Sequence, residues 1–241
     1  MSAMQVEVLG ETESLARRVA EWMIDRAQEQ SGDFAIALSG GSTPRGIYEH
    51  LAAPASLERF PWTRAHWFWG DERFVSHYDA RSNFLMAWKA LLSRAPIPAG
   101  NIHAVPVENV TSQDAAGAYE RALKEFYGAD ALDPARPLFA ITLLGLGEDG
   151  HFASLFPGTS ALDEHRRWAL AVIGAQPEPR ITLTYPALES SAHAAFLVAG
   201  ASKSAILRRF RASDPALPAS HFHPVGELRV FADSAAAGMP P

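Results

Sequence analysis

The stretch that decides the fold is Phe-Ala-Ile-Ala-Leu-Ser-Gly-Gly-Ser-Thr-Pro, residues 34–44. Its first five residues form a continuous apolar run, which is typical of a strand buried on both faces of a sheet. A helix is predicted next, because Ser42 or Thr43 can cap it and Pro44 suits its first turn. Apolar residues then recur at three- and four-residue spacing. The stretch therefore predicts a strand, a glycine-rich turn and a helix.

The same alternation of strand and helix patterns recurs along the chain. Strands are predicted at residues 66–69, 138–144, 194–199 and 228–231, and helices at residues 15–23, 84–92, 115–126 and 204–210. Residues 168–172 and 181–184 are predicted to form an antiparallel or edge pair. We therefore expect an α/β fold with a mostly parallel, Rossmann-like sheet, helices on both of its faces and a small additional strand and helix region.

Length and composition narrow the class of protein. The chain has 241 residues, and we expect residues 1–241 to form a single domain. The net charge of −6 argues against a nucleic-acid partner, because neutralising a phosphate backbone takes a surplus of Lys and Arg. The cysteine count of 0 excludes disulfides, thiolate catalysis and sulfur-ligated zinc.

The sequence also bears on location. No apolar run approaches the roughly 18 residues that span a bilayer, so no membrane partner is expected. The N-terminal residues lack the basic and then apolar pattern of a secretory signal. We expect a cytoplasmic protein.

Polar segments follow four of the predicted strands. They are residues 39–44, 70–73, 145–151 and 200–203. Because ligands of parallel sheets bind beyond the carboxyl ends of the strands, we expect these segments to meet in one cleft. The glycines and the helix start at residues 39–44 suit a phosphate, although a tight turn with an N-cap and no ligand explains that segment alone equally well.

Residues 145–150, Gly-Leu-Gly-Glu-Asp-Gly, match the G-x-G-x-x-G pattern of dinucleotide-binding proteins. Glu148 and Asp149 would repel a pyrophosphate, and Pro157 comes too soon for the long crossover helix that the motif requires. We therefore expect no nicotinamide or flavin cofactor.

Asp149 and His151 are better interpreted as an acid/base pair on a turn. Histidine exchanges protons near neutral pH, and a neighbouring carboxylate can hold its tautomer. An ordinary Asp-Gly turn with a surface histidine is the alternative. The position of His151 just after a buried strand favours the catalytic interpretation.

Other charged residues near the strand ends are candidates for binding an anion. Arg73, Arg180 and Lys203 could concentrate positive potential in an acidic protein, and Glu72 is expected to orient a neighbour. His221 and His223 could form a metal pair, but no third ligand is evident, so no metal site is expected.

Four ordered motifs carry a resemblance to a known family. They are residues 38–44, residues 70–75 with 79–83, residues 144–157 and residues 180–184. Together they resemble the 6-phosphogluconolactonase family, over nearly the whole chain. That family belongs to a wider group with the glucosamine-6-phosphate deaminases. The sequence departs from the family at Ser76-His77 and at residues 219–222.

The resemblance implies a role for each matched residue. The residues implied to bind the 6-phosphate are Ser39, Gly40, Gly41, Ser42 and Thr43, with Arg180 and Lys203 as cationic partners. His151 resembles the general base, Asp149 its neighbour, Arg73 a group that steadies substrate or oxyanion, and Asn83 a support of the site.

The implied reaction is hydrolysis of 6-phospho-D-glucono-1,5-lactone to 6-phosphogluconate, in the oxidative pentose phosphate pathway, with no metal or organic cofactor. In the deaminases, the positions of Leu155 and Phe156 hold an Asn-Glu pair that assists proton transfer, and this chain lacks it. The alternatives are a deaminase-like sugar-phosphate isomerase and a sensor that keeps the pocket without the chemistry. A monomer or small homo-oligomer is expected.

Overall fold

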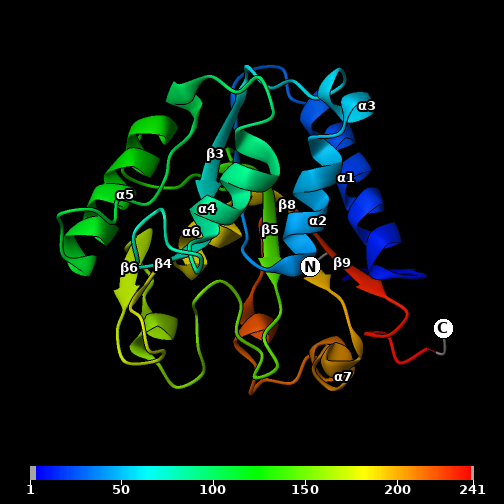
Figure 1. Cartoon of the computed structure of the whole chain (residues 1–241). Coiled ribbons are helices and arrows are strands. Elements are labelled where there is room, and N and C mark those ends of the chain that lie inside the picture. Colours follow the sequence, from blue (N-terminus) through cyan, green and yellow to red (C-terminus); the bar gives the residue numbers. More distant parts are fainter. Residues whose placement is uncertain (1–3, 240–241) are drawn as a thin grey trace.

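A six-stranded parallel sheet runs through the centre of the protein (Figure 1). The computed structural model describes residues 4–239. In spatial order the strands are β1 (Gln5–Leu9), β9 (Glu227–Asp233), β8 (Ser191–Val198), β5 (Phe139–Gly145), β2 (Phe34–Leu38) and β3 (Ala65–Trp69). Every neighbouring pair is parallel. The predicted parallel sheet is confirmed, and its order places the last strand of the chain beside the first.

A second, antiparallel sheet of three strands lies at one side. Its order is β4 (Asp71–Arg73), β7 (Arg180–Leu183) and β6 (Ala169–Val172). The predicted antiparallel pair is β6 and β7. The sequence patterns did not predict β4, because its three residues are all charged, and β1 was missed as well. Both strands depend on pairing with a partner distant in sequence.

Helices cover both faces of the parallel sheet. Trp22 of α1 (Thr12–Gln28) packs on Phe231, with ring centroids 5.6 Å apart, and meets His193 of β8 edge-on. Phe210 of α7 (Ser204–Arg211) packs on Phe196 of β8 at 4.8 Å. Successive side chains of a strand point to opposite faces, so α1 and α7 lie on opposite faces of the sheet. The predicted fold class is confirmed.

The remaining helices differ in length and type. They are α2 (Ser42–Leu51), α3 (Pro54–Leu57), α4 (Asn83–Ala87), α5 (Ser112–Tyr127), α6 (Tyr185–Glu189), a π-helix (Trp88–Leu92) and the 3-10 helices Ala99–Asn101, Ser160–Asp163, Ala201–Lys203 and Pro218–His221. No helix within residues 4–239 combines the length and apolarity needed to cross a bilayer.

Two predicted helix features need correction. The N-cap of α2 is Gly41, and Ser42 and Thr43 lie inside its first turn without capping it. The helix predicted over residues 84–92 is an α-helix only to Ala87 and then a π-helix, in which the Ser93 N–H donates to the Trp88 carbonyl five residues earlier.

Candidate active site

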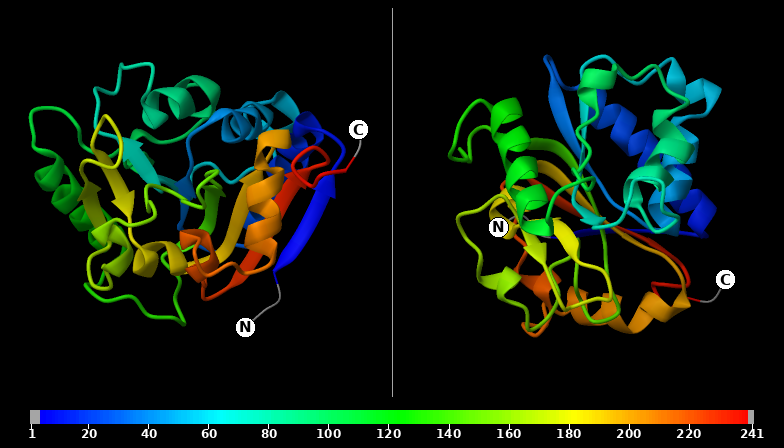
Figure 2. Two further views of the ribbon diagram at one scale, coloured as in Figure 1. Left: turned by 90° about the horizontal axis from the view of Figure 1, so that it is seen from below. Right: turned by 60° about the vertical axis from the view of Figure 1, so that its left-hand side comes forward.

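A cleft of about 400 Å³ lies at the carboxyl ends of the parallel strands, between them and the antiparallel sheet. It contains residues from all four polar segments singled out in the sequence. Eight of the predicted site residues line it: Ser39, Gly40, Gly41, Arg73, Asn83, His151, Arg180 and Lys203. Figure 2 shows how the loops after these strands gather below the sheet. The prediction that the four segments converge is confirmed.

The turn after β2 brings bare backbone into the cleft. A Cβ on Gly40 would lie 1.9 Å from the Asn83 Oδ1 atom, so this position has room only for glycine. Gly41 has a φ of 105° and leads directly into α2. The Tyr48 hydroxyl holds the start of the turn, accepting from the Ser39 N–H at 3.0 Å and donating to its carbonyl at 2.8 Å. The turn is thus fixed with the N-terminus of α2 beside it, where helix amides attract anions.

Ser42 and Thr43 are not among the residues that line the cleft. They form the first turn of α2, whose leading amides have no acceptor within the helix. Their predicted part in phosphate binding therefore rests on backbone N–H groups rather than on their hydroxyls.

Glu72 organises the wall formed by β4 and α4. It is 1% exposed, and its carboxylate accepts hydrogen bonds from the Arg73, Asn83 and Phe84 backbone N–H groups, each at 2.7 Å. Burial raises the pKa of Glu72 to about 7, although these backbone donors oppose the rise. The Asn83 side chain in turn donates to the Asp71 carbonyl at 2.9 Å. The expectation that Glu72 orients its neighbours is confirmed.

Arg73 and Arg180 face each other across the antiparallel pair β4 and β7. Like charges at opposed positions repel. Among the described residues, the buried Nε atom of each arginine has no hydrogen-bond partner. Burial, followed by the charge of Arg73, lowers the pKa of Arg180. Two cations so placed, with Lys203 also lining the cleft, suit an anionic ligand.

His151 and Asp149 form a close pair on the turn after β5. The His151 Nδ1 atom lies 2.5 Å from the Asp149 Oδ1 atom, which also accepts from the His151 backbone N–H at 3.1 Å. Because a carboxylate only accepts, Nδ1 carries the proton and Nε2 keeps its lone pair in the neutral ring. Burial raises the pKa of Asp149, but the hydrogen bonds from His151 outweigh it and the net shift is downward. Asp149 itself is not among the cleft-lining residues, so its contact with the cleft runs through His151.

The sequence analysis missed three polar residues of the cleft: Asp71, Ser154 and Gln176. The Ser154 hydroxyl donates to Asp71 Oδ2 at 2.6 Å, and both residues are buried. Asp71 lies inside the segment 70–73 already singled out, so it could have been found. Ser154 lies within residues 144–157, one of the four motifs singled out in the sequence, whereas no sequence pattern distinguishes Gln176.

The structure also shows the surroundings of two other sequence features, the G-x-G-x-x-G stretch and His221. Residues 146–159 form turns, and the next helical element is the short 3-10 helix Ser160–Asp163, so the crossover helix of a dinucleotide-binding motif does not follow β5. His221 lines a different cavity, with Glu189 and His165, and its Nε2 atom lies 2.8 Å from the Pro215 carbonyl. In residues 4–239, no group of three or more His, Cys, Asp or Glu side chains is arranged to hold a metal ion.

The family model described as glucosamine-6-phosphate isomerases/6-phosphogluconolactonase matches residues 10–230. The chain belongs to this family. The resemblance expected from the four sequence motifs is thereby confirmed.

Relatives within the family span nearly the same length. A 6-phosphogluconolactonase from Nostoc sp. is 42% identical over 237 residues, which cover 96% of each chain. A 6-phosphogluconolactonase from Rattus norvegicus is 37% identical and covers 94% of this chain and 88% of its own.

Solved structures of the family share the fold. The 6-phosphogluconolactonase from Trypanosoma cruzi superposes with a TM-score of 0.85 at 29% identity, covering 99% of this chain and 97% of that one. A monomeric glucosamine-6-phosphate deaminase superposes with a TM-score of 0.81 at 21% identity, covering 98% of this chain and all of that one. The second likeness shows only that the fold is shared, so the chemistry must be argued from the cleft.

Proposed function

We propose that this protein hydrolyses 6-phospho-D-glucono-1,5-lactone to 6-phosphogluconate, a step of the oxidative pentose phosphate pathway; the name 6-phosphogluconolactonase, which its relatives carry, supports this proposal. The observation that carries the proposal is the cleft itself. It places one carboxylate-held imidazole, His151, in the same cavity as three cations and a glycine turn at a helix start. A phosphorylated sugar lactone needs both features: an anchor for the phosphate and a base for water.

The phosphate anchor is the turn Ser39–Gly41 with the N-terminus of α2, together with Arg180 and Lys203. Backbone amides and the helix dipole hold the phosphate oxygens. The two side chains supply the charge. The orphaned Nε atom of Arg180 supports this role, because a buried donor without an acceptor is costly unless a ligand supplies one.

His151 serves as the general base. With Nδ1 hydrogen-bonded to Asp149, its Nε2 atom takes a proton from a water molecule, and that water attacks the lactone carbonyl carbon. Asp149 stabilises the imidazolium that forms. The proton then passes to the ring oxygen as the carbon–oxygen bond breaks, which yields the open acid.

Arg73 steadies the negative charge that develops on the carbonyl oxygen in the tetrahedral intermediate. Its guanidinium lines the cleft opposite Arg180 and keeps a free, buried donor at Nε within the described structure. A preorganised cationic donor of this kind stabilises an oxyanion more than the neutral carbonyl from which it forms.

Phe156 argues against the amino-sugar chemistry of the wider group. Its ring lines the cleft with its centroid 4.6 Å from that of His151, and Leu155 is fully buried. Neither side chain can carry a proton. The assisting carboxyl group implied for the deaminases therefore has no counterpart at positions 155 and 156.

The test is to assay acid release from 6-phosphogluconolactone and ammonia release from glucosamine 6-phosphate side by side. We expect lactone turnover well above spontaneous hydrolysis, and no ammonia. Ammonia without lactone turnover would overturn the proposal in favour of a deaminase. Neither product, with 6-phosphogluconate still bound, would favour a sensor.

We further propose that the protein acts in the cytoplasm on this small molecule alone, as a monomer or small homo-oligomer. The net charge of −6 supports the absence of a nucleic-acid partner.

A further inference from the structure

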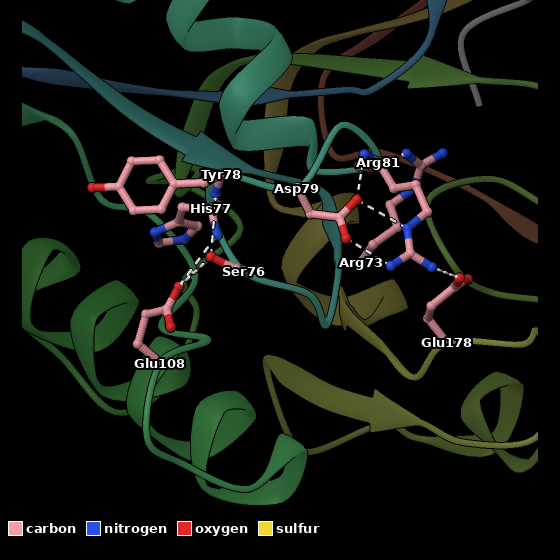
Figure 3. A network of polar contacts seen from close by, with 8 residues as sticks. All are labelled: Arg73, Ser76, His77, Tyr78, Asp79, Arg81, Glu108 and Glu178. Atoms are coloured by element: carbon pink, nitrogen blue, oxygen red, sulfur yellow. Dashed lines mark hydrogen bonds and ion pairs between the residues drawn. The ribbon is translucent and has the colours of Figure 1, made fainter.

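The segment of residues 74–82 joins two cleft residues, Arg73 and Asn83, by a route over the surface (Figure 3). Its first half is held by Glu108, which accepts from the Ser76 hydroxyl at 2.8 Å and the His77 N–H at 3.4 Å. Its second half is organised around Arg81. The segment is therefore tied down at both halves by polar contacts.

Arg81 makes an unusually complete set of contacts for a half-exposed side chain. Its Nε and Nη2 atoms donate to the two carboxylate oxygens of Asp79, at 2.9 and 2.6 Å, and its backbone N–H donates to Asp79 at 2.8 Å. These hydrogen bonds lower the pKa of Asp79 to about 2. The remaining Nη1 atom pairs with Glu178. The guanidinium is thus fixed on two sides.

Glu178 lies in the segment that leads into β7, two residues before the cleft residue Arg180. It lies between Pro177 and Pro179, whose rings restrict the backbone, in the segment that also carries Gln176 and leads into Arg180. The Arg81–Glu178 ion pair therefore connects the segment after β4 with the segment before β7. Figure 3 shows both carboxylates reaching the one guanidinium.

The backbone of Arg81 also holds Arg73. The Arg73 Nη1 atom donates to the Arg81 carbonyl at 2.5 Å. Arg73 needs such a restraint, because Arg180 stands opposite it with the same charge and its own Nε atom has no acceptor among residues 4–239. The position of the Arg81 carbonyl thus decides where the Arg73 guanidinium lies.

We propose that Arg81, fixed by Glu178 and Asp79, is a positioning residue that holds Arg73 in its catalytic orientation against the repulsion of Arg180. Arg81 and Glu178 are not among the cleft-lining residues, so they act through Arg73. The kinetic part of this inference rests on the proposed lactone hydrolysis. Because exposed ion pairs contribute little to stability, the effect belongs to catalysis rather than to folding.

The first experiment compares Glu178→Ala with a matched control, Glu21→Ala. Glu21 forms an ion pair with Arg59 at 2.8 Å, its side chain is 44% exposed against 23% for Glu178, and neither Glu21 nor Arg59 lines the cleft. We expect kcat/KM for the phosphorylated lactone to fall about tenfold in Glu178→Ala and to stay unchanged in the control, with equal melting temperatures. Equal kcat/KM values in both variants would overturn the proposal.

The second experiment repeats Glu178→Ala in an Arg73→Ala background. If Glu178 acts through Arg73, its removal has no further effect once Arg73 is gone. A second tenfold loss in that background would show that the ion pair has a merely structural role or acts elsewhere in the cleft.

A third measurement does not depend on activity. The Arg73 Nε–H resonance, assigned from an Arg73→Lys variant, is expected to shift or broaden in Glu178→Ala and to remain in place in Glu21→Ala. An unchanged resonance contradicts the positioning role even if the enzyme is active. Absence of lactone turnover by the unaltered protein contradicts the proposed function alone, and this spectrum then decides the positioning role.

Discussion

Two glycines in the cleft are required because a larger residue would collide with a neighbouring polar side chain. A Cβ on Gly147 would lie 2.1 Å from the His151 Nδ1 atom and 2.7 Å from an Asp149 carboxylate oxygen. The hydrogen-bonded pair of Asp149 and His151 therefore depends on glycine at position 147, which leaves room for both side chains. The same holds for Gly40 beside Asn83. Glycine is needed at both places so that a functional side chain can occupy the space, independently of any turn requirement.

At this scale, the variant His151→Asn is expected to lower kcat by about 10²–10⁴-fold, the usual contribution of a general base. The side chain is half-buried at the cleft and its loss leaves the core intact, so the melting temperature should not change. Steady-state kinetics on the lactone measure the effect, with His50→Asn on α2 as control. Turnover near that of the unaltered protein would remove His151 from the role of base.

Arg180→Ala and Lys203→Ala should separate phosphate binding from chemistry. Loss of a charged hydrogen bond is expected to lower kcat/KM for the phosphorylated lactone by about 10- to 100-fold. Hydrolysis of unphosphorylated gluconolactone should scarcely change, because the proposed partner of these cations is the remote phosphate. Arg209→Ala, which removes an ion pair to Asp214, is the control. Equal losses on both substrates would place the two cations elsewhere in the site.

At the scale of elements, β4 and α4 show how a buried charge organises two short segments. Neither is long enough to be stable alone. The Glu72 carboxylate joins them through backbone N–H groups of Arg73, Asn83 and Phe84. Ser82 caps α4 by accepting from the Leu85 N–H, and its hydroxyl donates to Glu72. The wall of the cleft thus depends on one side chain.

The pKa of Glu72 predicts a pH dependence of stability. Its folded pKa of about 7 lies above the ordinary 4.5, so the folded state binds the proton more tightly than the unfolded state. The contribution of Glu72 therefore falls as pH rises from about 4.5 to 7. The side chain of Glu72→Gln does not titrate. We therefore subtract the free energy of unfolding of the variant from that of the unaltered protein at each pH. This difference should be larger at pH 5 than at pH 8, by roughly 1 to 3 kcal/mol.

Urea unfolding at the two pH values measures this difference directly, since other carboxyl groups titrate alike in both proteins. A difference between the two proteins that is constant with pH, or larger at pH 8, would contradict the assignment of the raised pKa to Glu72.

At the scale of the whole molecule, the cleft depends on two sheets meeting. The parallel sheet supplies the turn Ser39–Gly41, His151 and Lys203 at its strand ends, whereas Arg73 and Arg180 come from the antiparallel sheet. The mechanism proposed for this cleft uses a histidine base and cationic or backbone donors throughout. That residues 1–241 form one domain stays a prediction.

Catalysis by these groups predicts that lactone hydrolysis survives exhaustive dialysis against EDTA. Residual activity relative to an undialysed sample is the measurement, and it should be unchanged within error. Loss of activity that is restored by zinc or magnesium would falsify the metal-free mechanism and direct attention to His221 and His223.

The sequence by itself determined most of the elements and the residue types of the loops that follow the strands. The buried strand Phe34–Leu38, the parallel strand pattern and the pair β6 and β7 could be predicted, because side-chain periodicity and glycine positions are local properties. Arg73, His151 and Lys203 could be predicted from their places at strand ends for the same reason, and they line the cleft. Six of the eight predicted residues that line the cleft belong to the four polar segments after the predicted strands, so they could be expected to meet at the carboxyl ends of a parallel sheet: Ser39, Gly40, Gly41, Arg73, His151 and Lys203.

Only the tertiary structure decided which of these groups act on one another. Arg73 lies opposite Arg180, and Arg81 pairs with Glu178; both contacts join segments about 100 residues apart. The hydrogen bond from Arg73 to the Arg81 carbonyl crosses a turn. The strand β4 exists only through its pairing with β7. Such contacts depend on long-range packing and leave no local periodicity in the sequence, which is why sequence patterns cannot predict them.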